Sequence, residues 1–140
     1  MYVMNEASID LPSGWKDQSI NVVSSGSPLE PGMTFTVTRD DVPFGMSFDE
    51  YLEDQVSEVS RKLDKFELLN RRGVTLDGAN GAEIECRWQS TQGPMHQLIY
   101  MVPTPGGRAM VMTVTAPVKL TDGQRAEMQR IIQTMRFRKG

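Results

Sequence analysis

The chain has 140 residues, of which 39% are hydrophobic and 24% charged, and its formal net charge is -3. This composition is typical of a single soluble globular domain spanning residues 1–140 rather than of a disordered or membrane protein. The absence of a basic excess argues against nucleic acid as a partner. Because no apolar run approaches the length of a membrane span, we do not expect the chain itself to be inserted in a membrane.

Cysteine usage and the first residues of the chain predict a cytoplasmic location, while methionine usage leaves two interpretations open. Cys86 is the single cysteine, so an internal disulfide cannot form. The first residues have neither the basic nor the apolar region of a signal peptide, and we therefore expect a cytoplasmic location. The chain has 10 methionines, whose flexible side chains either fill gaps in a core or line surfaces that accept varied apolar partners.

The first half of the chain predicts three strands and one helix. The strands are expected at residues 2–11, 15–23 and 33–39, with a polar loop at 24–32. Ser47 and Glu50 have the spacing of a capping box, which predicts a helix from residue 47 to about 65. Its apolar residues recur every three or four positions and form one stripe, made of Phe48, Leu52, Val56, Val59, Leu63 and Phe66.

The second half predicts four strands and a second helix. The strands are expected at residues 67–76, 82–89, 95–102 and 108–115. Turns are expected at Asp77-Gly78, Asn80-Gly81, Thr91-Gln92-Gly93 and Pro105-Gly106-Gly107. Thr121 and Gln124 form a second capping box for a helix to about residue 135. The expected buried face of this helix consists of Met128, Ile131, Ile132 and Met135. Short connections and segregated helices predict an α+β fold with an antiparallel sheet and two main helices.

The residues that carry most catalytic chemistry are scarce. His96 is the single histidine and lies in a predicted strand, as does Cys86, so a Cys86–His96 dyad across the hairpin is conceivable. No helix N-terminus or basic neighbour is evident that would lower the pKa of the thiol. One histidine and one cysteine cannot complete a structural zinc site, and the glycine-rich turns lead into strands rather than into a phosphate-binding helix. We therefore expect a protein that is not an enzyme and that holds neither a metal nor a cofactor.

Three glutamines lie on predicted apolar faces. Gln55 lies between Leu52 and Val59 on the helix stripe, and Gln18 and Gln97 each share a strand face with aliphatic residues. Each could lie at the edge of its face and contact water. Alternatively, the amides could bind polar atoms of a ligand that is otherwise apolar.

One segment resembles a family motif. It reads Leu11-Pro12-Ser13-Gly14-Trp15-Lys16-Asp17-Gln18-Ser19-Ile20-Asn21-Val22. This resembles the Leu/Ile-Pro-x-x-Trp-x-Asp-x-Ser-Ile-Asn motif of the Eag chaperones of bacterial type VI secretion. Three later segments agree with the family pattern in the same order, namely Phe35-Thr36-Val37-Thr38-Arg39-Asp40, Phe48 to Gln55 with Tyr51, and Trp88-Gln89 followed by Gln97.

The resemblance implies a fold, an assembly and a partner. The fold would be similar to Mog1 and to the PsbP proteins of photosystem II. A homodimer would bind the N-terminal transmembrane helices of a secreted effector and keep them shielded until the effector is loaded onto the secretion spike. The implied effector-binding positions are Ile20, Val22, Gln55, Val59, Leu63 and Gln97. Thr36 is left out, because an aliphatic residue could be expected at that position.

Two alternatives remain open at this point. The first is a lipid- or small-ligand-binding domain of the same fold, which a signal peptide or lipobox cysteine would favour. The second is an enzyme that uses Cys86 and His96, which rapid alkylation of the thiol at neutral pH would favour.

Overall fold

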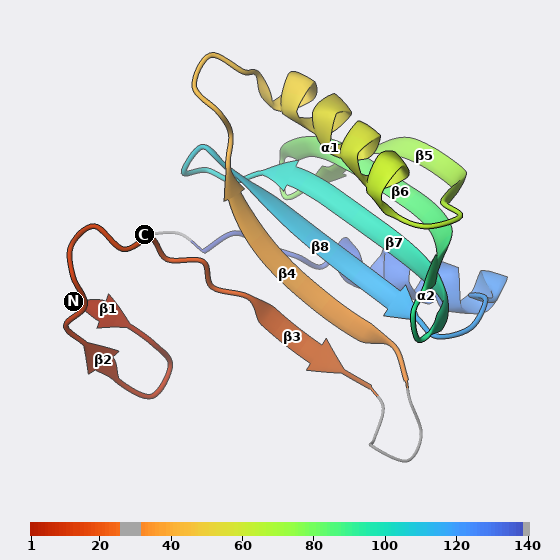
Figure 1. The fold of residues 1–140 in the computed structure, drawn as a ribbon, viewed down its shortest axis with the longest axis horizontal. Coiled ribbons are helices and arrows are strands. Elements are labelled where there is room, and N and C mark those ends of the chain that lie inside the picture. Colours follow the sequence, from red (N-terminus) through yellow and green to blue (C-terminus); the bar gives the residue numbers. More distant parts are fainter. Residues whose placement is uncertain (26–31, 139–140) are drawn as a thin grey trace.

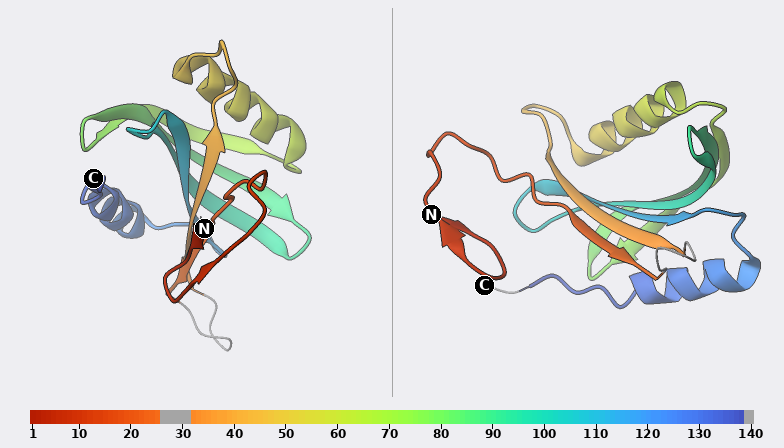
Figure 2. Two further views of the ribbon diagram at one scale, coloured as in Figure 1. Left: turned by 90° about the vertical axis from the view of Figure 1, so that its left-hand side faces the viewer. Right: turned by 60° about the horizontal axis from the view of Figure 1, so that its bottom comes forward.

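The computed structural model describes residues 1–25 and 32–138, which form a curved antiparallel sheet between two helices. Helix α1 (Phe48–Lys62) lies on one face of the sheet and α2 (Asp122–Ile132) on the other (Figures 1 and 2). The sheet order is β3-β4-β8-β7-β6-β5. These strands are β3 (Asn21–Ser24), β4 (Thr34–Asp41), β5 (Glu67–Leu76), β6 (Ala79–Ser90), β7 (Gly93–Pro103) and β8 (Arg108–Ala116). The predicted antiparallel α+β fold with two helices is confirmed.

Side chains alternate along the strands and form one core on each face of the sheet. The α1-side core consists of Leu52, Ala82, Ile84, Cys86, Ile99 and Met101. The α2-side core consists of Val37, Val74, Leu76, Leu98, Tyr100, Val102, Met112, Val114, Ala116, Leu120 and Ile132. Met33, Met110, Met128 and Met135 pack against this second core, so these methionines, with Met112, serve packing.

Both predicted capping boxes are present, at Ser47 and at Thr121. Helix α1 ends at Lys62 rather than near residue 65, because Leu63 is already extended with ψ 130°. Helix α2 ends at Ile132, and the prediction that Ile131 is buried is wrong, since its side chain is 41% exposed. None of the helices in residues 1–25 and 32–138 combines the length and the apolar character that a membrane span requires.

One of the two predicted turns before β6 is confirmed and the other is wrong. Asp77 (φ 47°) and Gly78 (φ 85°) make the turn between β5 and β6, but Asn80 and Gly81 lie within β6. A side chain at position 81 would place its Cβ 2.0 Å from the carbonyl oxygen of Met101. Gly81 is therefore explained by close approach of two strands rather than by a turn.

The predicted strands before β4 are shorter in the structure. Residues 2–11 form a small hairpin of β1 (Tyr2–Val3) and β2 (Ser8–Ile9), and of residues 15–23 only 21–23 belong to a strand. The Asp17 carboxylate accepts a hydrogen bond of 2.9 Å from the backbone N–H of Ser19. This local turn competes with strand pairing and delays β3 until Asn21. The loop predicted at 24–32 falls largely on residues 26–31, which lie outside the described residues.

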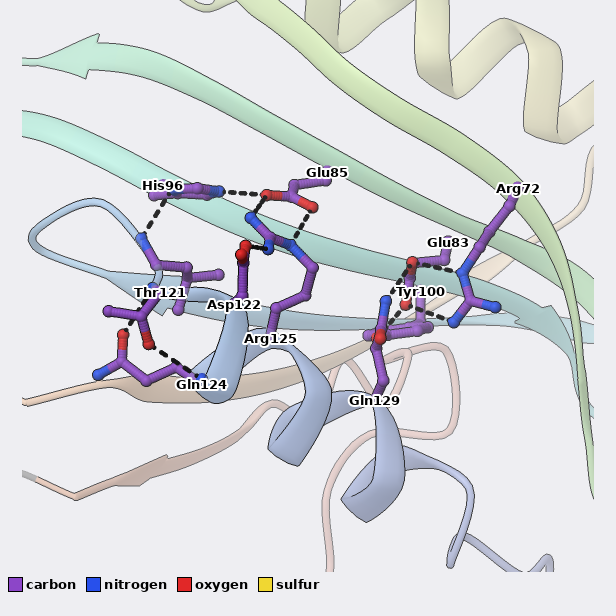
Figure 3. A network of polar contacts seen from close by, with 11 residues as sticks. Arg72, Glu83, Glu85, His96, Tyr100, Thr121, Asp122, Gln124, Arg125 and Gln129 are labelled. Carbon is purple, nitrogen blue, oxygen red and sulfur yellow. Dashed lines mark hydrogen bonds and ion pairs between the residues drawn. The ribbon is translucent and has the colours of Figure 1, made fainter.

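Two buried carboxylates on β6 join α2 to the sheet (Figure 3). Glu83 is 1% exposed and Glu85 is 5% exposed. From α2, Arg125 donates two hydrogen bonds to Glu85, at 2.6 and 2.7 Å, and Gln129 donates one to Glu83 at 3.1 Å. From the β5 side, Arg72 donates to both oxygens of Glu83 at 2.7 and 3.1 Å. Each buried charge therefore has the partners that burial requires.

His96 belongs to the same network and has a defined protonation pattern. Its Nδ1 atom accepts a hydrogen bond of 3.0 Å from the backbone N–H of Leu120, immediately before α2. The ring proton must therefore lie on Nε2, which donates to Glu85 over 2.6 Å. His96 therefore has a structural role, because its bond to Leu120 supports the start of α2.

The network shifts the titration of both glutamates. Hydrogen bonds, above all from Arg125, outweigh burial and hold the pKa of Glu85 below its ordinary value. Burial alone would raise the pKa of Glu83, but hydrogen bonds from Arg72 and Tyr100 outweigh it and leave that pKa lowered as well. A carboxylate with a lowered pKa stabilises the folded state above its unfolded pKa, and this contribution is lost as the pH falls through the folded pKa.

We predict that the free energy of unfolding, measured in urea, falls as the pH drops below 4.5, the ordinary pKa of a glutamate. Glu85→Gln should lower the free energy of unfolding at pH 7 by about 2–3 kcal/mol, because Arg125 loses its buried carboxylate partner and keeps only the exposed Asp122. In the same variant, the free energy of unfolding should also depend less on pH below 4.5, because the glutamate that titrates there is absent. Glu127→Gln on α2 is the matched control, since the pair of Glu127 with Arg130 is exposed and its loss should not be measurable. Equal effects of the two variants would contradict the structural role of the network.

Candidate binding surface

The face of the sheet that carries α1 is covered only in part (Figure 1). Phe48, Leu52 and Val56 of α1 pack over β6 and β7 in the α1-side core. Thr113 of β8 is paired with Ile99, which belongs to the α1-side core, so Thr113 lies on the same face. Its partner on β4 is Thr36, and the partner of Thr36 on β3 is Val22. We call the uncovered part the open face; its residues are Val22, Thr34, Thr36, Thr38, Thr113 and Thr115.

The open face is lined mainly by threonine, and the first charged side chain beyond it on the same face of β4 is Asp40, which accepts a hydrogen bond from Tyr51. In the described part of the chain, the hydroxyls of Thr34, Thr36, Thr38 and Thr113 have no hydrogen-bond partner, while that of Thr115 accepts one from Gln97. These threonines were not selected from the sequence. Their alternation at positions 34, 36 and 38, and again at 113 and 115, was the available signal, because alternate strand residues share a face.

Two of the predicted binding residues lie at the β3 side of the open face. Val22 is 64% exposed and pairs with Thr36. Ile20 is 60% exposed and lies immediately before β3, two residues from Val22. Aliphatic side chains this exposed are available to a partner.

Two more predicted residues lie on the flank of α1 that faces β4. The Tyr51 hydroxyl donates to Asp40 of β4 over 3.0 Å, whereas Glu53 pairs with Arg71 of β5 on the opposite flank. Gln55 follows Tyr51 by one helical turn and Val59 follows Gln55 by another, so both lie on the β4 flank. Both are half-buried.

Gln97 lies on β7 between the α1-side core and the open face. Its Oε1 accepts from the Trp88 indole over 2.8 Å, and its Nε2 donates to Thr115 over 3.0 Å. These two bonds orient the amide and leave one N–H of Nε2 for another acceptor.

The structure therefore gathers five of the six predicted residues around the open face. Leu63 is the sixth and lies away from the open face, because it is the C-cap of α1, where the chain turns toward β5. Whether these residues bind an effector stays a prediction.

Cys86 and His96 do not form a dyad. Cys86 pairs with Gln97 and its side chain belongs to the α1-side core, while His96 bonds to Glu85 toward α2. The two side chains thus lie on opposite faces of the sheet. Burial raises the pKa of the Cys86 thiol to about 12, so the thiol is not poised as a nucleophile.

A second apolar surface lies between β4 and α2. It is a hollow of about 360 Å³ on the other side of the sheet. Its lining includes Phe35, Met112, Met128, Ile131, Ile132 and Met135. None of the six predicted binding residues lines it.

Solved structures share this fold. A Pseudomonas aeruginosa protein of unknown function, PA94, matches with a TM-score of 0.77 and 21% identity over 99% of this chain and 96% of that chain. The cyanobacterial PsbP protein (CyanoP) of Synechocystis matches with a TM-score of 0.51 and 12% identity, covering 90% of this chain and 94% of that chain. These likenesses confirm the expected PsbP-like fold.

Relatives in sequence agree with the motif found at residues 11–22. The Pseudomonas aeruginosa protein "Effector EagT6" is 28% identical over 92 residues, which are 64% of this chain. The match spans 62% of that relative, which is less than two thirds of its length, and it confirms the resemblance to Eag proteins. The model of the DcrB family matches residues 6–134, nearly the whole chain. The chain therefore belongs to the DcrB family.

Proposed function

We propose that this protein is a chaperone that binds and shields the N-terminal transmembrane helices of a type VI secretion effector. The open face carries this proposal, because its six residues are uncharged on a chain in which 24% of the residues are charged. The similarity to EagT6 supports the same class of function.

The dimensions of the open face suit one α-helix. From β3 to β7 there are three strand spacings, about 14 Å in all, and a helix with its side chains is about 10–12 Å wide. The part of β4 that belongs to the open face, residues 34–38, extends over about 17 Å, a little more than half of the roughly 30 Å of a membrane-spanning helix. A helix lying along β4 and β8 would contact Val22 on one side and the flank of α1 with Gln55 and Val59 on the other.

The chemistry of the open face suits a helix that is mainly apolar but carries some polar atoms. The backbone N–H and C=O groups of a helix are hydrogen-bonded within the helix, so the chaperone has to cover only its apolar side chains. Val22, Ile20 and Val59 can do so by apolar contact. Threonine hydroxyls and the amides of Gln55 and Gln97 can pair with polar atoms on the helix.

The proposal also includes the mode of action, the oligomeric state and the location of the protein. The protein acts by binding rather than by catalysis, as a homodimer in the cytoplasm, and releases its effector to the secretion spike. It needs no metal or cofactor for this role.

The first test places a charge on the rim of the open face. Ile20→Asp or Val22→Asp should weaken capture of a transmembrane helix at least about tenfold, because a carboxylate would be desolvated without a partner. The probe is a fluorescent peptide of about 20 apolar residues flanked by lysines, and the measurement is its co-elution with the protein. Val118→Asp is the matched control, since Val118 is also exposed (67%) but lies outside the open face. Undiminished capture by both rim variants would refute the site.

The second test concerns the amide of Gln55. Gln55→Leu keeps the volume and removes hydrogen bonds worth about 0.5–1.5 kcal/mol each, so binding should weaken by about tenfold at most. The loss should be larger for a peptide with serine and glycine on one face than for a leucine-only peptide. Gln92→Leu, in the exposed turn between β6 and β7, is the control. Equal losses for the two peptides would show that Gln55 acts only by packing.

The hollow beside α2 favours a second candidate, the binding of a lipid or another small apolar ligand. Ile131→Asp places a charge in that hollow and leaves the open face intact. If Ile131→Asp abolishes peptide capture and Val22→Asp does not, apolar ligands bind beside α2 and the helix-binding proposal fails.

A further inference from the structure

A series of hydrogen bonds runs across three strands, from the edge of the α1-side core to the open face. It begins at Trp88 on β6, whose indole Nε1–H donates to Oε1 of Gln97 on β7 over 2.8 Å. The Nε2 atom of Gln97 then donates to Oγ1 of Thr115 on β8 over 3.0 Å. Since β6, β7 and β8 are consecutive in the sheet, each bond joins two neighbouring strands (Figure 1). The series ends at a residue of the open face.

Strand register brings the three side chains within reach of one another. Gln97 is paired directly with Thr115 on one side and with Cys86 on the other, and these residues share one face of the sheet. Cys86 is small and fully buried, so the larger Trp88, two residues further along β6, can reach the amide diagonally. Trp88, Gln97 and Thr115 are all half-buried. The amide of Gln97 is therefore held between two fixed neighbours.

The direction of these bonds follows from the chemistry of the indole. An indole N–H can only donate, so the amide oxygen of Gln97, and not its nitrogen, has to face Trp88. The amide nitrogen then faces Thr115, whose hydroxyl oxygen accepts. The second N–H of Gln97 and the O–H of Thr115 are left as donors, and in residues 1–25 and 32–138 neither of them has an acceptor. Bonds in such a series also strengthen one another, because each polarises the next.

We propose that Trp88 is a positioning residue for client recognition, which orients Gln97 so that Gln97 and Thr115 present hydrogen-bond donors to the client. This inference rests on the proposed function and narrows the class of client. The helix that fits carries an acceptor oxygen at this point. Such an oxygen belongs to a polar side chain, or to a backbone carbonyl that a proline has released from its helical bond.

A client helix without an acceptor is penalised at this site. In the empty protein, water can accept from both donors. A wholly apolar helix that covers them removes this water and leaves the donors unsatisfied, which costs more than an ordinary hydrogen bond gains. A helix with an acceptor oxygen restores a bond. Selection of this kind depends on the penalty for the wrong partner as much as on attraction to the right one.

Loss of the indole N–H should remove the selectivity and leave the fold in place. Without the bond from Trp88, the amide of Gln97 can turn over, so a covering helix no longer meets a fixed donor. In Trp88→Phe, an aromatic ring still packs against the α1-side core, where Trp88 packs in the wild type. This variant therefore separates the orientation of the amide from the packing of the ring.

Two peptides that differ by one oxygen atom test the selectivity. Each has about 20 apolar residues flanked by lysines and one central methionine, which is either reduced or oxidised to the sulfoxide. The sulfoxide adds an acceptor oxygen and no donor. The measured quantity is the ratio of the Kd of the reduced peptide to the Kd of the sulfoxide peptide, from fluorescence anisotropy. This ratio should be about fivefold smaller for Trp88→Phe than for the wild type, which corresponds to one neutral hydrogen bond.

Two further variants complete the test. Thr115→Val should also lower the ratio, because it removes the terminal hydroxyl and nearly keeps the shape of the side chain. Trp15→Phe is the matched control, since Trp15 is the other of the two tryptophans and lies outside the open face and both cores. Its ratio should equal that of the wild type. An unchanged ratio in Trp88→Phe, with the circular dichroism spectrum of the folded protein, would overturn the proposal.

Nuclear magnetic resonance provides a readout that altered packing alone would not produce. In the wild type, the sulfoxide peptide should shift the side-chain amide signals of Gln97 more than the reduced peptide does, because one N–H gains an acceptor. In Trp88→Phe, the two peptides should shift these signals equally. Equal shifts in the wild type would show that the oriented amide does not bind the acceptor, and the proposal would be wrong.

The outcome is separable from that of the proposed function. If the wild type captures both peptides and the ratio does not depend on Trp88, the positioning role is wrong and the chaperone proposal stands. If the wild type captures neither peptide, the chaperone proposal fails and the positioning role fails with it.

Discussion

The ion pair between Glu85 of β6 and Arg125 of α2 fixes which face of the sheet α2 covers. A buried carboxylate is tolerated only with close partners, and those of Glu85 are Arg125, from α2, and His96, which also holds the residue before that helix. Side chains alternate along β6, so the opposite face at Ala82, Ile84 and Cys86 is apolar and receives α1. The arrangement of both helices thus follows from the placement of charge on one strand.

A single helix cannot cover the second face. Helix α1 is about 10–12 Å wide, whereas the six strands of the sheet extend over about 24 Å, so the part over β3, β4 and β8 stays open. A leucine-rich surface of this kind would promote aggregation in water. Threonine is compatible with both states of the proposed chaperone, because its hydroxyl bonds to water in the empty protein and its methyl group would contact apolar side chains of a bound client. In the proposed function, this is a physical reason for threonine on a surface that stays hydrated when empty and accepts a transmembrane helix.

The two edges of the sheet differ in chemistry, as its two faces do. Charges and an irregular register protect β5 against association, while β3 is uncharged and follows a segment, residues 1–20, with exposed apolar side chains. Unprotected surface is therefore concentrated on one side of the molecule, where the open face and the β3 edge adjoin.

The sequence by itself determined the features that depend on residues a few positions apart. Both capping boxes, the Asp77-Gly78 turn and the antiparallel α+β class were predicted correctly, because each follows from local hydrogen bonding or from periodicity. The family motif and the apolar patterns also selected Val22, Gln55, Val59 and Gln97, which the structure brings together. Tertiary structure alone decided the partners of Glu85, which lie 11 and 40 positions away, and the separation of Cys86 and His96 onto opposite faces. It also explained Gly81 by a neighbouring strand rather than by a turn, and it showed that the threonines of β4 and β8 form one surface. Strand register and long-range packing set these contacts, and neither can be derived from the spacing of residues along the chain.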